Sequence, residues 1–133
     1  MVSVSKPHPA SPDHRSMFLN DVFGDDNMVR PDQLVAILKL SKLDIAPALG
    51  LSRDALSKTV RQNSPKTQSR LREVVEILNR VLPWAGTPVK AWAWYRSESL
   101  PGFGDMTAEQ LVKDGMGDAV RRYLDEIAIG GYA

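Results

Sequence analysis

Polar side chains between residues 52 and 66 have the types and spacing that suit contact with a nucleic acid. Arginine and lysine neutralise phosphates, arginine can also donate two parallel hydrogen bonds to a guanine edge, and hydroxyl groups bond to either. The N-terminal part of a recognition helix reaches deepest into the major groove, so residues there contact bases while their neighbours contact phosphates. The candidates are Arg53, Ser57 and Lys58 for base edges, and Ser52, Thr59, Arg61 and Lys66 for phosphates.

Residues 43–60 indicate two short helices joined at a glycine, the layout of a helix-turn-helix. Ala46 is small enough for two helices to cross closely, and Gly50 tolerates the positive φ that closes the turn. Ser52 suits the N-cap of the second helix, with Asp54 in its positive first turn. The same pattern fits an ordinary pair of helices inside a bundle. The residues expected to be buried beneath the pair are Ile45, Leu49, Leu51, Leu56 and Val60.

The chain offers few groups that could catalyse a reaction or hold a metal. It contains no cysteine, and its two histidines, His8 and His14, have no companion ligands nearby in the sequence. The acidic pairs at 25–26 and 125–126 are adjacent residues, which point in different directions on a helix and cannot readily share a proton. The segment 102–104 lacks the lysine and hydroxyl residue that follow a phosphate-binding loop. We therefore expect a protein that is not an enzyme and that uses no cofactor, metal or small-molecule substrate.

Length and composition are those of a globular protein. The 133 residues, 43% of them hydrophobic, are enough for one ordinary core or for two small helical lobes that share one. The absence of cysteine suits a reducing compartment. Neither a secretory signal nor a run of about 18 apolar residues is visible, so we expect a cytoplasmic location and no membrane contact.

Charge is distributed unevenly along the chain, although the formal net charge is only +1. From Gly50 to Arg80 there are seven basic and three acidic residues, a local balance of +4. From Asp105 to Ala133 there are three basic and six acidic residues, a balance of −3. The basic part could face phosphates, whose neutralisation supplies most of the sequence-independent affinity for DNA. Both parts are also compatible with ordinary solvated helix faces.

The patterns along the chain predict helices and no sheet. Residues 1–15 combine prolines and serines without apolar periodicity, which indicates a flexible tail. One helix is expected from Pro31 to about Ser41, and a long amphipathic helix has apolar positions from Leu71 to Val81. No run alternates with a period of two for long enough to form a strand. The expected fold class is all-α, a helical bundle.

Three further helices are expected in the second half of the chain. Thr87 followed by Pro88 opens the first, and Thr107 with Gln110 forms a capping box for the second. The last helix runs from about Asp118 to the glycine pair at 130–131.

From Gly86 onward the residues are similar to a known signature. It resembles the C-terminal toxin-binding domain of the Xre/MbcA/ParS family of bacterial antitoxins, and with the helix-turn-helix ahead of it the likeness covers about residues 31–133. Members often carry proline where Ala108 stands and threonine near Asp114, so the likeness is incomplete there. The matching residues are Gly86-Thr87-Pro88-Val89-Lys90-Ala91, Trp94, Leu100-Pro101-Gly102-Phe103-Gly104, Met106 to Val112, Gly117, Ile127 and the ending at 130–133.

The resemblance implies a partner and two functions. The partner would be a RES-domain toxin, an enzyme that degrades NAD⁺, and the antitoxin would also bind the operator DNA of its own operon, as a homodimer on paired half-sites. Together with the composition of the N-terminal residues, the resemblance predicts a tail (1–15), an Xre-like helix-turn-helix DNA-binding region (16–68) and a toxin-binding domain (69–133).

The C-terminal residues are the expected inhibitory element, because in this family the end of the antitoxin obstructs the toxin's active-site cleft. The matching residues are Gly130, Gly131, Tyr132 and Ala133. Trp92 and Trp94 point about 200° apart on a helix, so one is expected in the core and the other nearer the surface. Since Trp94 matches the family motif, we expect it inside and Trp92 outside, where it could contact the toxin.

Two other functions are compatible with the sequence. One is a stand-alone helix-turn-helix transcriptional regulator whose C-terminal lobe dimerises and has no toxin partner. The other keeps toxin binding but uses the basic face only for assembly. A neighbouring gene for a RES-type protein distinguishes the antitoxin from the regulator, and retardation of an operator fragment tests DNA binding.

Overall fold

The computed structural model describes residues 12–130, with side chains from residue 17 to residue 129. This part of the chain is all-α, as the sequence predicts, and contains no strand beyond two isolated β-bridges. Its helices are α1 (Pro12–Val22), α2 (Pro31–Leu38), α3 (Lys42–Ala48), α4 (Thr59–Gln62), α5 (Pro65–Ala85), α6 (Pro88–Ser97), α7 (Ala108–Lys113) and α8 (Gly117–Gly130).

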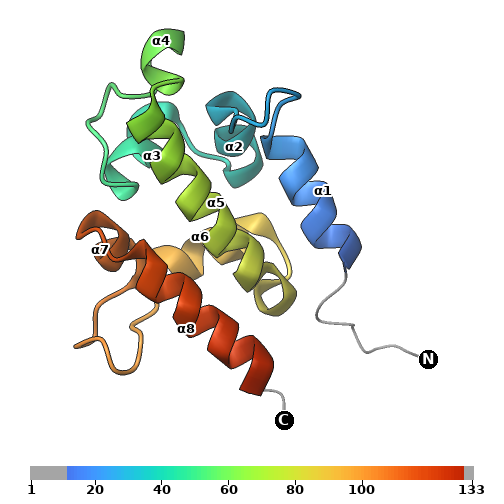
Figure 1. Cartoon of the computed structure of the whole chain (residues 1–133), viewed down its shortest axis with the longest axis vertical. Coiled ribbons are helices and arrows are strands. Elements are labelled where there is room, and N and C mark those ends of the chain that lie inside the picture. The colour runs from blue at the N-terminus through green and yellow to red at the C-terminus, as the bar shows by residue number, and fades with distance from the viewer. Residues whose placement is uncertain (1–11, 131–133) are drawn as a thin grey trace.

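Helix α5 is the centre of the fold, and the other helices pack around it (Figure 1). Helices α1, α6 and α8 lie directly against α5, α2 packs on α1, α3 and α6, and α7 joins α6 to α8. Because several neighbours cover it, α5 buries side chains on more than one face. One cluster of buried apolar residues includes side chains from every described helix except α4. The two halves of the chain therefore share a single core.

Caps encoded in the sequence fix several helix starts. The Thr107 hydroxyl accepts the backbone N–H of Gln110, and the Gln110 side chain accepts the N–H of Thr107, which completes the predicted capping box. Thr87 accepts the N–H of Lys90 in the same way, with Pro88 in the first helical position. Both predicted start signals are confirmed.

The N-terminal boundary differs from the prediction. Helix α1 begins at Pro12, so residues 12–15 are helical and do not belong to a flexible tail, whereas residues 1–11 lie outside the described residues. A proline fits the first turn of a helix, because the N–H groups there have no intrahelical partner. The expected division between residues 68 and 69 falls inside α5, which is continuous.

Two other findings concern the described residues. No helix between residues 12 and 130 has both the length and the apolar character needed to cross a membrane. Within the same range, no group of three or more histidine or acidic side chains is placed to hold a metal ion.

Candidate functional site

The segment after Gly50 is not the helix that the sequence predicts. Residues 51–58 form turns, and α4 is a single helical turn before α5. Asp54 organises these turns, because its carboxylate accepts a hydrogen bond from Ser52 Oγ (3.2 Å) and its main-chain oxygen accepts one from Ser57 Oγ (2.7 Å). Such local bonds compete with helix formation, so Ser52 does not act as an N-cap. Gly50, with φ of 76°, does close the turn after α3.

The prediction of which apolar residues in this segment are buried is only partly correct. Ile45, Leu49 and Leu56 are fully buried, as expected, and Leu51 is half-buried. Val60 is 84% exposed, so the prediction that it is buried is wrong. The reason is that the chain enters α4 only at Thr59, and this short helix places no side chain in the core.

Gln68 of α5 helps to hold residues 51–58, called here the turn-rich segment. Its Nε2 donates to the main-chain oxygens of Gln62 (3.0 Å) and Val29 (2.9 Å), and its Oε1 accepts the Val29 N–H (2.8 Å). Gln62 in turn donates to the oxygen of Leu56 (2.7 Å). These bonds hold the start of α5 to both loops that precede it, so the exposed side chains sit on an ordered base.

All seven predicted DNA-contacting side chains are exposed. Arg61 already forms an ion pair with Asp54 (2.8 Å), and this hydrogen bond lowers the pKa of the Asp54 carboxyl below its ordinary value. Arg53, Lys58 and Lys66 form no ion pair with the side chains that the structure describes, those of residues 17–129. The structure therefore offers three free cations at the α4 end of the molecule, on turns and helix starts and not along one recognition helix.

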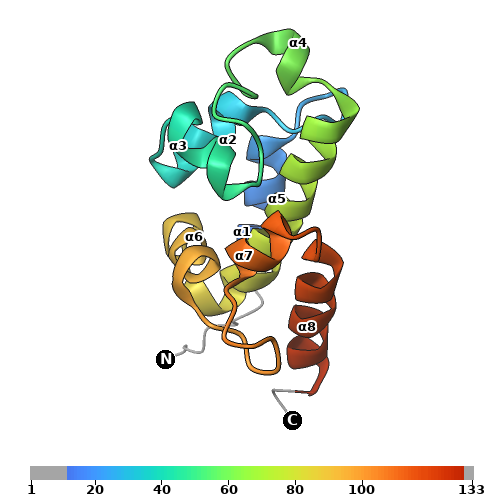
Figure 2. The ribbon, with the colours of Figure 1, turned by 90° about the vertical axis from the view of Figure 1, so that its left-hand side faces the viewer.

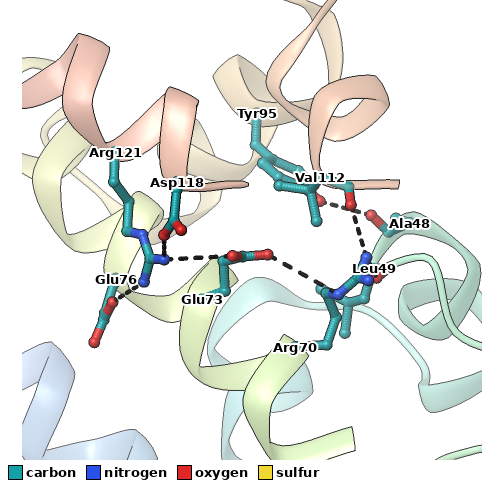
Figure 3. A network of polar contacts seen from close by, with 9 residues as sticks. All are labelled: Ala48, Leu49, Arg70, Glu73, Glu76, Tyr95, Val112, Asp118 and Arg121. Atoms are coloured by element: carbon teal, nitrogen blue, oxygen red, sulfur yellow. Dashed lines mark hydrogen bonds and ion pairs between the residues drawn. The ribbon is translucent and has the colours of Figure 1, made fainter. Parts of the chain in front are cut away.

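Side chains from α5 and α6 donate hydrogen bonds to main-chain oxygens at the C-terminal end of α3 (Figure 3). The last carbonyls of a helix lack intrahelical partners. The Tyr95 hydroxyl donates to the oxygen of Ala48 (2.7 Å), and Arg70 Nη1 donates to the oxygen of Leu49 (3.0 Å). Burial, with a further contribution from the charge of Glu109, raises the pKa of Tyr95 above its ordinary value. The start of the turn-rich segment is thus held by the C-terminal half of the chain.

Arg70 also reaches the C-terminal helices. The same Nη1 donates to the oxygen of Val112 in α7 (2.7 Å), and Arg70 Nε lies 3.9 Å from Glu73 Oε1. Glu73 faces Arg121 of α8 (3.4 Å), as Figure 3 shows. Residues of α5 thereby connect the end of α3 with α7 and α8.

The burial of the two tryptophans of α6 is the reverse of what the sequence predicts. Trp92 is 6% exposed and stacks on Tyr95 with ring centroids 5.0 Å apart, whereas Trp94 is half-buried. Helix α6 buries Ala91, Trp92 and Tyr95 together, so its rotation is set by these neighbours. Trp92 is therefore not a surface residue, and we withdraw it as a toxin contact.

The other predicted toxin contacts are Gly130 and the three residues that follow it in the sequence. Gly130 is the last residue of α8, and Gly131, Tyr132 and Ala133 lie outside the described residues. Ile129, directly before them, is 84% exposed. The C-terminal end of α8 and the short helix α4 are at opposite ends of the long axis of the molecule (Figures 1 and 2).

The sequence interpretation missed Arg70 and Tyr95. Their main-chain partners are 21, 42 and 47 residues away in the chain, so no local pattern signals these bonds. For Trp92 a signal was present: Ala91 and Tyr95, four residues apart, mark the buried stripe of α6 on which it lies. No protein-family model matches the chain, and comparison with curated proteins and with solved structures also finds no match.

Proposed function

We propose that this chain is an antitoxin that binds and inhibits a RES-domain toxin which degrades NAD⁺, and that it also binds the operator DNA of its own operon, as a homodimer. The observation that carries the proposal is that the candidate DNA-binding region and the candidate toxin-binding region lie at opposite ends of a molecule with one core. The exposed cations lie in the turns before α4, in α4 and in the first turn of α5. The C-terminal end of α8 lies at the far end of the long axis from α4 (Figure 2). A DNA duplex and a protein partner can then bind without competing for space.

The C-terminal half supports the toxin-binding part of the proposal. The residues that carry the family likeness have defined structural tasks here: Gly86 ends α5 with φ of 91°, Thr87 caps α6, and Gly102 and Gly104 adopt positive φ in the loop before α7. Helix α8 packs on α5 with Val120 and Leu124 in the shared core, and Arg80 of α5 pairs with Asp125 of α8 (2.8 Å). A rigidly held helix presents the residues after it at a defined place, which favours insertion into a cleft.

Removing the last four residues is expected to abolish protection against the toxin. A chain that ends at Ile129 keeps the described part of α8 through that residue but loses Tyr132, and loss of an aromatic anchor costs on the order of 2 kcal/mol, roughly thirtyfold in Kd. Co-expression with the toxin, with growth and cellular NAD⁺ as readouts, measures the effect. A chain lacking residues 1–11 is the control and should protect fully. Equal protection by both shortened chains contradicts tail insertion.

The DNA-binding part of the proposal now relies on phosphate contacts more than on base reading. Six of the seven candidate residues lie in the turns of residues 51–58 or in α4, and Lys66 lies in the first turn of α5. A helix of four residues such as α4 is too short to lie along a major groove. Three exposed cations can neutralise phosphates: Arg53, Lys58 and Lys66. Arg61 already forms an ion pair with Asp54. We retain Arg53 as the candidate for a base edge because its guanidinium is exposed and has no ion-pair partner among the described side chains of residues 17–129.

Substituting Lys58 is expected to weaken binding to all DNA sequences alike. The slope of log K against log salt concentration is negative, and each lost phosphate contact reduces its magnitude by about 0.9, so Lys58→Ala should flatten that slope in a filter-binding titration. Arg53→Ala should in addition narrow the difference between operator and unrelated DNA. Lys90→Ala is the matched control, because Lys90 is an exposed lysine of α6 in the other half of the chain. If all three variants bind like the full chain, this surface does not contact DNA.

A further inference from the structure

We propose that the short helix α4 reads an A·T base pair in the major groove of DNA, with Val60 against the methyl group of the thymine and Asn63 hydrogen-bonded to the edge of the adenine. The inference rests on the proposed function, because it names the bases that the DNA-binding part of the chain prefers. The neighbouring cations contact the phosphates and position α4 on the duplex.

Helix α4 is held so that one side of it points away from the rest of the molecule. The Gln62 side chain turns inward, since its Nε2 donates to the oxygen of Leu56 (2.7 Å), and the main-chain oxygen of Gln62 accepts a bond from Gln68 (3.0 Å). Val60 precedes Gln62 by about 200° of helical rotation, so its side chain lies on the opposite side and is 84% exposed. Because α4 lies at one end of the long axis, this side faces outward there (Figures 1 and 2).

Val60 and Asn63 are the residues of the outward side that can distinguish one base from another. The N–H of Asn63 bonds to the oxygen of Thr59 (3.0 Å), so Asn63 continues the spacing of α4. Residues three apart on a helix are neighbours, with Cβ atoms about 5–6 Å apart. Both side chains are exposed, and the Asn63 amide has no hydrogen bond to any described residue. By contrast, Arg61 is paired with Asp54, and the Thr59 hydroxyl bonds to any base.

The chemistry of these two side chains matches one base pair. In the major groove thymine presents a methyl group, and adenine presents an acceptor, N7, beside an amino donor. The amide of asparagine has a donor and an acceptor that fit this edge of adenine, and valine gains by removing the methyl group from water. A G·C pair has no methyl group, and its guanine presents two acceptors. Val60 and Asn63 together therefore favour A·T.

Size and charge favour DNA as the occupant of this side of α4. The major groove is about 12 Å wide and a helix is about 10–12 Å across, so a single turn can enter the groove although it is too short to follow it. Its rise of about 6 Å covers about two base pairs. Lys58 directly precedes α4, Lys66 lies in the first turn of α5, and neither has an ion-pair partner among the described side chains. Val60 is thus flanked by cations, which suits a polyanion better than an apolar protein surface.

The test removes single groups from the DNA as well as from the protein. A short duplex, selected by the full chain from a randomised library, is compared with copies that carry deoxyuridine in place of one thymine or 7-deazaadenine in place of one adenine. Deoxyuridine lacks the methyl group, and 7-deazaadenine lacks the N7 acceptor. At the pair that α4 reads, the full chain should lose about fourfold in Kd with the first and about fivefold with the second, measured by filter binding.

Each substitution in α4 should remove one of these responses. Val60→Ala should bind the deoxyuridine duplex as well as its parent, and Asn63→Ala should do so for the 7-deazaadenine duplex, while each variant keeps the other response. The salt slope should stay unchanged in both, because no phosphate contact is lost. Val89→Ala is the matched control, since Val89 is an exposed valine (40%) of α6, and it should respond like the full chain. Circular dichroism and Tm verify that all variants fold alike.

The outcomes separate this contact from the function on which it rests. If the full chain binds DNA but selects no A·T pair, or if both α4 variants respond like the full chain, α4 does not read an A·T pair and the DNA-binding function stands. If Val60→Ala keeps the deoxyuridine response and instead changes the mass of the chain in sedimentation without DNA, this side of α4 is a contact between copies and the inference is wrong. If the full chain binds no DNA, the inference and the DNA-binding function fail together.

Discussion

Replacing Arg70 by alanine should destabilise the chain by about 2–3 kcal/mol, the range for a lost hydrogen bond to a charged group plus an unpaired buried acceptor. Arg70 Nη1 donates to the oxygens of Leu49 and Val112, at 3.0 and 2.7 Å. The Val112 oxygen retains the N–H of Gly115 (3.0 Å), but the Leu49 oxygen lies past the end of α3 and has no other donor among residues 12–130. The main cost is therefore at the start of the turn-rich segment.

Arg72 provides the matched control on the same helix. It donates one hydrogen bond to the exposed oxygen of Asn27 (2.9 Å) and lies 5.5 Å from the centroid of the Phe23 ring. Arg72→Ala should cost about 1 kcal/mol or less. Urea denaturation followed by circular dichroism measures both variants, and an unchanged m-value shows that the denatured state is comparable. A cost for Arg70→Ala no larger than that for Arg72→Ala contradicts a bridging role.

Arg70→Lys separates charge from geometry at the same position. Lysine keeps the positive charge beside Glu73 but lacks the planar fork of five donors that lets arginine reach two carbonyls. We expect it to recover less than half of the stability lost in Arg70→Ala. Full recovery would mean that the charge near Glu73, and not the bonds to Leu49 and Val112, holds the helices together.

The sequence predicted the elements that local chemistry determines. Proline at the first position of α2 and the capping box at Thr107 each depend on residues within four positions, and both are present in the structure. The long helix α5 was also readable, since its apolar positions recur at helical spacing from Leu71 to Val81. These signals are strong because one turn of helix contains all the interacting groups.

The candidate site was harder to predict because its conformation depends on competition between local and distant contacts. In the sequence Ser52 suits the N-cap of a helix with Asp54 in its first turn, but in the structure Asp54 forms hydrogen bonds with Ser57 and Arg61. At Trp92 and Trp94, helical geometry showed that one must be inside, and the choice depended on packing with Tyr95. Tertiary contacts of this kind override local preference and have no signature in a short window.

Replacing Tyr95 by phenylalanine should cost about 1–2 kcal/mol at neutral pH and should change how stability responds to alkali. The lost hydroxyl leaves the oxygen of Ala48 without its donor (2.7 Å), while the stacking on Trp92 is retained. The pKa of Tyr95 is raised in the folded chain, first by burial and then by the charge of Glu109. Folding therefore holds the hydroxyl neutral above the pH at which an unfolded tyrosine ionises.

The sign of the pH effect follows from this linkage. Below about pH 10, the ordinary pKa of tyrosine, both states keep the proton and the contribution of Tyr95 is complete. Above it the unfolded chain loses a proton that the folded chain retains, so the free energy of unfolding falls by about 1.4 kcal/mol per pH unit from this group. The advantage of the full chain over Tyr95→Phe should shrink at that rate as the pH rises from 10.

Tyr123→Phe is the control, because its half-buried ring packs on Phe103 and its hydroxyl has no hydrogen bond to any described residue. Urea denaturation at steps between pH 7 and pH 11 gives the two difference curves. That for Tyr95→Phe should decline above pH 10, and the Tyr123→Phe variant should follow the alkaline fall of the full chain. Parallel curves for the full chain and Tyr95→Phe would show that the hydroxyl ionises as freely in the folded chain as in the unfolded one, which its enclosed bond to Ala48 does not allow.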